Sequence, residues 1–403
     1  MVHDLPHAAV FEVTGAGTQG LAWLHAAAGS SRTVLEATDR YNIAALTDAL
    51  GDPPRHAVSV EVAQRLAARA RARALQLLGE GESQPAVGVS ATATIATDRP
   101  KRGRRGAALA VETGLGVASL SLGFDEAERP GLREHEEAVV SALLLGLLAE
   151  GCGIDAVPLV LSVAGVDAGR AEQALAPAPE LSALLAGDRD AVAAPASGRT
   201  DARAPLPAAG AVIVSGAFDP WHQGHRALGA AAAAVAAAPP GAIWYELPII
   251  NADKAPLLPR EAWRRAAQFA GTGNLLLSRA PLFHDKALLY PGATFVVGAD
   301  TAERLVQPRF YGDSERAMEL ALGEIEAAGC HFVVACRTAG PGRGLAPGRS
   351  STTSAAPLCL EDLHLPQRFA GLFTSIPVES FRMDVSSTEI RQATAAEWHQ
   401  LTS

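Results

Sequence analysis

Two histidines three residues apart follow a short apolar run near the middle of the chain. His222 and His225 come after the run 212–214 and a turn that reads Ser-Gly-Ala-Phe-Asp-Pro, and an alanine-rich segment follows them. This order predicts a strand, a tight turn and a helix that begins near the histidines. A helix N-terminus offers unpaired N–H groups and partial positive charge, so it suits a phosphate group. The pattern therefore indicates phosphate binding, with metal ligation or a chance surface pair as the alternatives.

The glycines of this stretch fit the same interpretation. Glycine lacks a Cβ, so the backbone at Gly216 and Gly224 can approach a ligand closely. The residues expected to line a nucleotide here are Gly216, Ala217, Phe218, Asp219 and Gly224.

The string GAFDPWHQGH, residues 216–225, resembles the GxFDPxHxGH signature of the nucleotidylyltransferase superfamily. Two later motifs extend the resemblance in the family's order. Gly298-Ala299-Asp300 follows an apolar strand, and residues 386–391, SSTEIR, are similar to the family's closing SSTxIR signature.

The resemblance implies transfer of a nucleotidyl group from a nucleoside triphosphate to a phosphate or alcohol, with release of pyrophosphate. Catalysis then consists of positioning and of stabilising negative charge on phosphoryl oxygens. His222 and His225 would contact the triphosphate, and the guanidinium of Arg391 would hold its β- or γ-phosphate. Ser386, Ser387 and Thr388 would add hydrogen-bond donors. Mg²⁺ would accompany ATP, because hard oxygen ligands favour it.

Other residues of the expected crevice follow strands. The carboxylate of Asp300 suits ribose hydroxyls, although an ordinary role at the start of a helix is the alternative. Gly298 belongs to the same motif, and Arg337 follows the strand predicted at 331–335. Because ligands of open parallel sheets bind outside the carboxyl ends of the strands, His222, Asp300 and Arg337 could converge.

Lysine is rare in this chain and arginine carries most of the positive charge. Lysine occurs only as Lys101, Lys254 and Lys286, which mildly favours a role for each as a compact ammonium. Lys254 follows the second predicted strand of this region and is our candidate for neutralising the phosphate of the acceptor. Trp221 and Trp244 are candidates for base stacking, but core packing is the favoured interpretation of both.

Among the superfamily's members, the three motifs most resemble the adenylyltransferases of nicotinamide or nicotinate mononucleotide. The leading hypothesis is transfer of adenylyl from ATP to one of these mononucleotides, giving NAD or its acid and pyrophosphate. One alternative is a cytidylyltransferase that acts on a phosphorylated small molecule. Another is a protein without catalysis that binds a pyridine nucleotide or acts as a scaffold.

The first part of the chain reads as an α/β unit. Apolar runs at 8–13, 86–90 and 107–111 predict strands, and apolar spacing predicts helices at 21–28, 43–50, 60–78 and 134–148. Ser59 is the expected N-cap of the third helix. This mixture implies helices packed on a sheet.

This unit resembles the C-terminal domain of the competence-damage-inducible protein A (CinA) family, which includes nicotinamide mononucleotide deamidases. The matching pieces are Thr18-Gln19-Gly20-Leu21, Gly29-Ser30-Ser31, Tyr41 ahead of Gly51, and the segment 57–63.

The departures from that family bear on activity. Ala16 stands where the family has its nucleophilic serine, Leu46 stands where it has a lysine, and residues 92–97 replace its glycine-rich loop. Amide hydrolysis through a hydroxyl nucleophile needs the hydroxyl and a group that activates it. We therefore expect a catalytically degenerate domain, with Thr18 as the alternative nucleophile.

The expected fold class is α/β with two domains. Residues 1–165 form the CinA-like domain and 211–403 a Rossmann-like, parallel-sheet nucleotidylyltransferase domain. Residues 166–210 form the linker, with a short helix expected at 170–185 and a mobile stretch rich in Ala, Pro, Asp and Arg at 187–210. Strands are predicted at 211–215, 243–247, 275–278, 294–297 and 331–335, and helices at 226–238, 260–270, 285–289 and 315–328. A fragment 205–403 would then fold independently.

Composition limits the classes of binding partner and the cellular compartment that we expect. A net charge of −9 and the absence of a long basic block argue against nucleic-acid binding. No uninterrupted apolar run reaches the roughly eighteen residues of a membrane span, and the N-terminus lacks a signal-peptide pattern. Cys152, Cys330, Cys336 and Cys359 have no framework spacing and are expected to be reduced thiols in a cytoplasmic protein. The expected partners are ATP and a mononucleotide, with homo-oligomerisation through the N-terminal domain left open.

Overall fold

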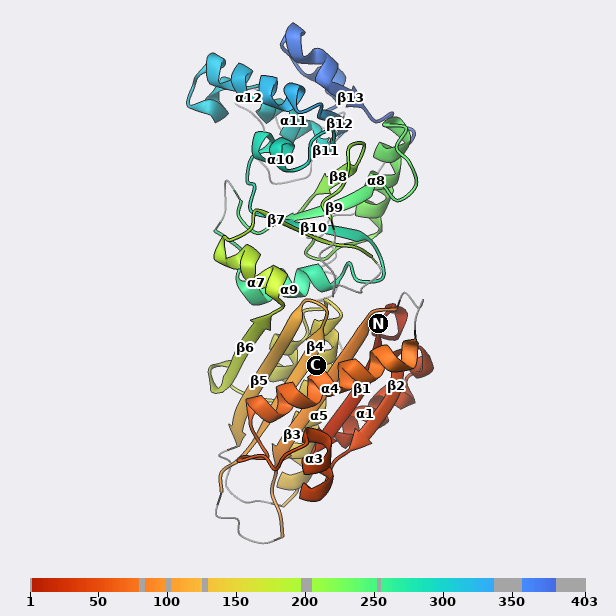
Figure 1. Ribbon diagram of the computed structural model, residues 1–403, viewed down its shortest axis with the longest axis vertical. Coiled ribbons are helices and arrows are strands. Elements are labelled where there is room, and N and C mark those ends of the chain that lie inside the picture. The colour runs from red at the N-terminus through yellow and green to blue at the C-terminus, as the bar shows by residue number, and fades with distance from the viewer. Residues whose placement is uncertain are drawn as a thin grey trace, which may run out of the picture.

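The computed structural model describes residues 2–79, 84–98, 103–124, 130–196, 205–251, 255–336 and 357–381. These residues form two mixed sheets with helices packed on them, so the chain is an α/β protein. The first sheet occupies the lower part of Figure 1 and the second the upper part. The two expected site regions lie on different sheets.

The first sheet has the order β2-β1-β3-β4-β5-β6. Its parallel part joins β1 to β2 and β3, and the neighbours from β3 to β6 pair antiparallel. The strands are β1 (Ala8–Thr14), β2 (Val34–Asp39), β3 (Ala86–Thr94), β4 (Arg105–Thr113), β5 (Gly116–Phe124) and β6 (Ala171–Pro177). The sequence patterns indicated β1, β3 and β4 but missed the other three.

Two long helices cover opposite faces of this sheet. The first is α4 (Val60–Leu78), whose N-terminus is capped by the Ser59 hydroxyl as expected, and the second is α5 (Leu132–Gly151). Val10 of β1 packs with the α4 face, and its neighbour Phe11 packs with the α5 face, since adjacent strand residues point to opposite sides. Gly88 lets α4 approach very closely, because a Cβ there would stand 2.0 Å from the Ala67 carbonyl oxygen.

Shorter helices complete this part of the chain. They are α1 (Thr18–Ala26), α2 (Ser30–Thr33), α3 (Ile43–Leu50) and α6 (Val157–Val163). The predicted helix at 43–50 is confirmed residue for residue, and its N-terminus is capped by the Asn42 side chain.

The second sheet has the order β13-β12-β11-β8-β9-β10-β7. All neighbours pair parallel except β7 and β10, which are antiparallel. The strands are β7 (Ala191–Ala194), β8 (Val212–Ser215), β9 (Ile243–Pro248), β10 (Asn274–Ser278), β11 (Thr294–Gly298), β12 (His331–Ala335) and β13 (Phe373–Ser375). The chain moves outward from β8 to β10 on one side and returns to β11 on the other, so the direction of winding reverses between β8 and β11.

Helices alternate with these strands. They are α8 (Gln223–Val235), α9 (Pro259–Ala267), α10 (Phe283–Leu289), α11 (Ala299–Leu305) and α12 (Glu315–Ala327). All five predicted strands are confirmed. The predicted helices are confirmed within a few residues, except that α11 was not foreseen.

The connection predicted at 166–210 contains more regular structure than expected: the short helix expected at 170–185 is present as α7 (Pro179–Ala186), but the strands on either side of it were not foreseen. Residues 171–177 form β6 at the edge of the first sheet, α7 follows, and residues 191–194 form β7 at the edge of the second. β6 and β7 are stabilised by pairing with strands from other parts of the chain, which a composition rich in alanine and proline does not indicate. A fragment that begins at 205 would lack β7.

The expectation of four reduced thiols is also corrected. Cys336 and Cys359 form a disulfide, while Cys152 and Cys330 are free and buried. Spacing along the chain could not reveal the pair, because their approach depends on how the chain returns after β12. Within the described residues, every helix is too short or too polar to span a membrane.

Candidate functional site

His222 and His225 lie at the N-terminus of α8, immediately after the turn that leaves β8. His222 is the N-cap: its Nδ1 accepts the backbone N–H of Gly224 at 3.1 Å. The His225 Nδ1 accepts the backbone N–H of His222 at 3.2 Å, which completes a reciprocal capping box. The two rings lie 3.9 Å apart between centroids. The expected strand, turn and helix are therefore confirmed, and both imidazoles take part in starting the helix.

The electrostatics of the pair make both rings neutral near pH 7. Burial lowers the pKa of His222, and burial together with the adjacent His222 ring lowers the pKa of His225 to about 4. Because both Nδ1 atoms accept backbone N–H groups, each neutral ring carries its proton on Nε2. The pair therefore presents two Nε2–H donors, without net positive charge, beside the N-terminus of α8.

The turn before the histidines is held by α9 and its C-terminal end. Arg265 donates to the Ala217 carbonyl oxygen at 2.8 Å and pairs with the Asp219 carboxylate at 3.3 Å. Arg264 approaches the other Asp219 oxygen at 3.4 Å. Gln268 donates to the Phe218 carbonyl oxygen and accepts the Trp221 N–H, both at 2.8 Å. Asp219, expected to contact nucleotide, thus has two arginine partners within the protein.

Aromatic side chains pack within and against this turn. Phe218 is buried and meets the edge of the His225 ring at 5.0 Å between centroids. Trp221 packs on Tyr245 and Phe269, and Arg226 lies over its ring at 4.3 Å. The favoured interpretation of Trp221, packing rather than base stacking, agrees with these contacts.

The second motif lies at the end of the neighbouring strand. The register pairs Val296 of β11 with Val214 of β8, so Gly298 and the turn after Ser215 leave the sheet at the same edge. Gly298 is the N-cap of α11 and Asp300 lies in its first turn. The structure thus brings the turn at 216–225 and the Gly298–Asp300 motif to adjacent carboxyl ends, where the winding reverses. Gly298 also pairs with Ala335, two residues before Arg337.

Several predicted site residues lie outside the described part of the chain. They are Lys254, Arg337, Ser386, Ser387, Thr388 and Arg391. Their roles stay predictions.

A cluster of buried charged residues lies at Ser215, the last residue before the turn, and the sequence predicted it only in part. Lys286 of α10 forms a 2.6 Å ion pair with Glu246 of β9, and its ammonium donates to the Ser215 hydroxyl at 3.1 Å. The Glu246 carboxylate also accepts the hydroxyls of Ser215 and Ser278. Lys286 was flagged by the scarcity of lysine, but nothing in local spacing linked it to Glu246. The cluster ties the last residue of β8 to two neighbouring elements.

The first sheet carries a second candidate region at the loop after β1. Ala16 is buried there and offers no nucleophile, and Leu46 is buried and apolar. The Glu137 carboxylate accepts the backbone N–H groups of Gly17 and Gln19 and the Thr18 hydroxyl, at 3.0–3.1 Å. The protein's own carboxylate thereby occupies the N-terminus of α1. Beside this loop lies a cavity of about 250 Å³ that is lined by Thr14, Tyr41, Leu46, Thr94 and Arg133 among others.

Solved structures that resemble part of this chain include competence/damage-inducible proteins and members of the CinA superfamily. One is the competence/damage inducible protein CihA from Agrobacterium tumefaciens, with 20% identity, a TM-score of 0.29, and coverage of 37% of this chain and 94% of that chain. Another is a CinA superfamily protein from Escherichia coli, with 16% identity, a TM-score of 0.27, and coverage of 37% and 80% respectively. Neither a family model nor a curated protein matches the chain.

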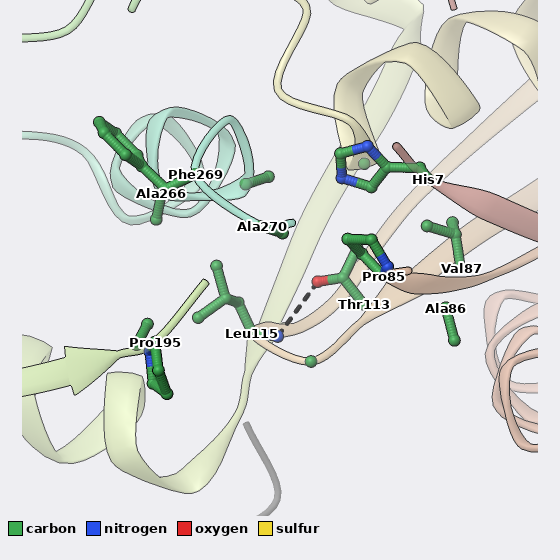
Figure 2. Close-up of a pocket in the computed structure, with 14 residues that line it drawn as sticks. His7, Pro85, Ala86, Val87, Thr113, Leu115, Pro195, Ala266, Phe269 and Ala270 are labelled. Atoms are coloured by element: carbon green, nitrogen blue, oxygen red, sulfur yellow. Dashed lines mark hydrogen bonds between the residues drawn. The ribbon is translucent and has the colours of Figure 1, made fainter. Parts of the chain in front are cut away.

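A smaller cavity lies where the two sheets meet. Its volume is about 30 Å³, enough for a water molecule or two. Figure 2 shows His7 and Pro85 on one side of it and Ala266, Phe269 and Ala270 on the other. Burial lowers the pKa of His7 to about 4, against a smaller opposing effect of the Ala267 backbone. A site this small and apolar favours close packing of the sheets over substrate binding.

Proposed function

We propose that the protein transfers an adenylyl group from ATP to nicotinamide or nicotinate mononucleotide, which yields NAD or its acid and pyrophosphate. One observation carries the proposal: two neutral imidazoles with Nε2–H donors flank a helix N-terminus at the reversal between β8 and β11. N–H donors at a helix N-terminus are suited to the oxygens of a triphosphate.

The topology of the second sheet supports the proposal. The parallel order β10-β9-β8-β11-β12-β13 reverses its direction of winding between β8 and β11. In open parallel sheets, ligands bind in the crevice where the strand order reverses. His222 and Asp300 follow the two strands that flank this crevice.

The proposed step needs no covalent intermediate. An oxygen of the acceptor phosphate forms a bond to the α-phosphorus of ATP. The bond between that phosphorus and the oxygen that bridges to the β-phosphate breaks, and its electron pair leaves with pyrophosphate. The Nε2–H groups of His222 and His225 would donate to phosphoryl oxygens whose charge grows in the transition state. Asp300 would accept ribose hydroxyls, and Lys254 and Arg391 would supply positive charge.

The described residues do not offer a ready site for a resident metal ion. The one close group of three metal-type donors that they contain is Cys336, Cys359 and Glu361, and its two cysteines are bonded to each other. Mg²⁺ prefers oxygen ligands, so no step is assigned to a resident ion. Mg²⁺ would enter as the complex with ATP, as part of the substrate.

A direct assay tests the proposal. The full-length chain is incubated with Mg²⁺, each nucleoside triphosphate in turn, and nicotinamide mononucleotide, nicotinate mononucleotide or a phosphorylated alcohol, and pyrophosphate is measured. Pyrophosphate formed with ATP and a mononucleotide supports the proposal. Pyrophosphate formed only with CTP and a phosphorylated alcohol favours the cytidylyltransferase alternative, and none with any pair favours a binding or scaffold protein.

A further inference from the structure

Helix α9 lies between the first sheet and the turn that precedes the histidines. It belongs by sequence to the second sheet, but in Figure 1 it borders the first, together with α7. Residues of α9 contact both the first sheet and this turn, so a displacement of the first sheet can move the turn. The contacts at the two ends of α9 determine how tightly the first sheet and the turn are coupled.

The N-terminal end of α9 is anchored in the first sheet by Arg260. The guanidinium forms two short bonds, 2.6 and 2.7 Å, to the carboxylate of Glu150 near the end of α5. It also donates to the carbonyl oxygens of Ser119 in β5 and Ala174 in β6, at 3.1 and 3.0 Å. Glu150 is buried and the Arg260 side chain is 19% exposed. A bidentate, largely desolvated pair of this kind fixes geometry as well as adding energy.

The C-terminal end of α9 meets the first part of the chain at Gly153. A Cβ on Gly153 would stand 2.4 Å from Cγ and 2.7 Å from the backbone nitrogen of Gln268, so only glycine fits there. The next turn is also enclosed, since a Cβ on Gly271 would stand 2.9 Å from Pro6 and from Pro85. Gln268 is the residue that holds both Phe218 and Trp221, on either side of Asp219-Pro220.

We infer that residues 150–153 of the first part of the chain act as a positioning element for the histidine pair, through Arg260 and Gln268 of α9. The N-terminal half then takes part in the proposed transfer site without touching substrate. This inference rests on the proposed function for its effect on rate, whereas the placement of the histidines can be measured without it. The interior is close-packed, so a shift of Gln268 is passed on to Phe218 and to the His225 ring on it. A misplacement of about 1 Å can cost about 100-fold in rate.

The test compares two glycine-to-alanine variants of the full-length chain. Gly153 has a φ of +89° and Gly51 has a φ of +83°, so alanine strains the backbone by a similar amount at both. An added Cβ at Gly51 has nothing within 4 Å, whereas at Gly153 it collides with Gln268. Gly51→Ala is therefore a matched control for strain alone.

Two readouts are taken: kcat for pyrophosphate release, and the pKa of His225 by NMR. For Gly153→Ala we expect kcat to fall about 100-fold, and the His225 pKa to rise from about 4 towards 6.5 as solvent reaches the ring. Gly51→Ala should leave both unchanged. Should Gly153→Ala not fold, Arg260→Lys, which cannot make all four bonds at once, is measured in its place.

The outcomes separate this inference from the proposed function. An unchanged His225 pKa in a folded Gly153→Ala or Arg260→Lys protein overturns the positioning role, whatever the activity. A pKa that rises in a protein whose wild type releases no pyrophosphate supports the positioning role and removes the proposed reaction. Equal changes in both glycine variants would assign the effect to backbone strain and overturn the inference.

Discussion

At the residue scale, the histidine pair combines a structural and a proposed chemical role. His222 uses Nδ1 to cap α8 and, in the proposed reaction, Nε2–H to bind phosphate. A simple truncation would remove both, so the two roles must be separated in the experiment.

Replacing the imidazoles should lower the rate of transfer sharply while the fold persists. His222→Ala loses the cap and should cost about 0.5–2 kcal/mol of stability, and loss of a charge-stabilising donor should lower kcat by about 10²–10³-fold. His222→Asn can still accept the Gly224 N–H, so it should recover stability but not activity. His225→Ala should lower kcat to a similar extent. Near wild-type turnover of the alanine variants, with stability followed by urea unfolding, would contradict the role.

The loop after β1 should not hydrolyse an amide. Ala16 has no nucleophilic atom, Leu46 has no ammonium, and the Thr18 hydroxyl donates to Glu137. A positioned base alone commonly contributes about 10²–10⁴-fold, but the Glu137 carboxylate that Thr18 contacts also accepts two backbone N–H groups of the loop and so is engaged in holding the loop. We expect the full-length protein to release no ammonia from nicotinamide mononucleotide. Steady ammonia release that is lost in Thr18→Ala would instead make Thr18 a nucleophile and the protein bifunctional.

At the scale of elements, local patterns identified strands with continuous apolar runs and helices with clear caps. The helix at 43–50 and the five strands predicted for the second region are confirmed, because apolar periodicity and capping residues act over a few neighbours, whereas the short strand β13 was not foreseen. β2 and β6 were missed because each is a partly exposed edge strand with mixed polarity. Their stability comes from pairing with a sheet that lies elsewhere in the chain.

The buried ion pair that joins β8, β9 and α10 should be costly to break on one side. Lys286→Met leaves the Glu246 carboxylate buried without its cation, so unfolding free energy should fall by about 3–5 kcal/mol. Lys286→Met combined with Glu246→Gln removes the buried charge and should recover most of that loss. The exposed pair of Arg73 and Glu36 is the matched control, and Arg73→Met should cost less than about 1 kcal/mol.

Urea unfolding of the four proteins provides the measurement. A loss in Lys286→Met no larger than that in Arg73→Met would show that the cluster is solvated and does not hold Ser215.

At the scale of the whole molecule, the two sheets share one buried apolar cluster. It includes Phe11 and Leu144 of the first sheet region and Tyr245, Trp263 and Phe269 of the second. The expectation that 205–403 folds independently conflicts with this continuity, because cutting the chain would expose the junction face of α9. Independence was predicted from the composition of the connecting segment, which says nothing about the surfaces on either side of it.

The junction should weaken in mild acid through His7. The unfolded chain protonates His7 near 6.5, whereas the folded chain does so only near 4. Below pH 6.5 the unfolded state therefore binds the proton first, and unfolding free energy falls until about pH 4, by about 3 kcal/mol in total. The wild type should show this fall in unfolding free energy, and the fall in His7→Leu should be smaller by about 3 kcal/mol. His56→Leu, at an exposed histidine, should keep the wild-type profile, and an unchanged profile in His7→Leu would contradict the assignment.

The sequence by itself determined the strand, turn and helix around His222, the α/β class, the absence of a hydroxyl at Ala16 and the order of the motifs along the chain. These depend on residue identity and on neighbours within a few positions. Only the tertiary structure decided that Gln268 donates to the turn at Phe218 and that Gly153 packs against Gln268. It also decided that Lys286 pairs with Glu246 and that Cys336 bonds to Cys359. Each of these contacts joins residues far apart in the chain, and their geometry follows from how whole elements pack, which no local pattern encodes.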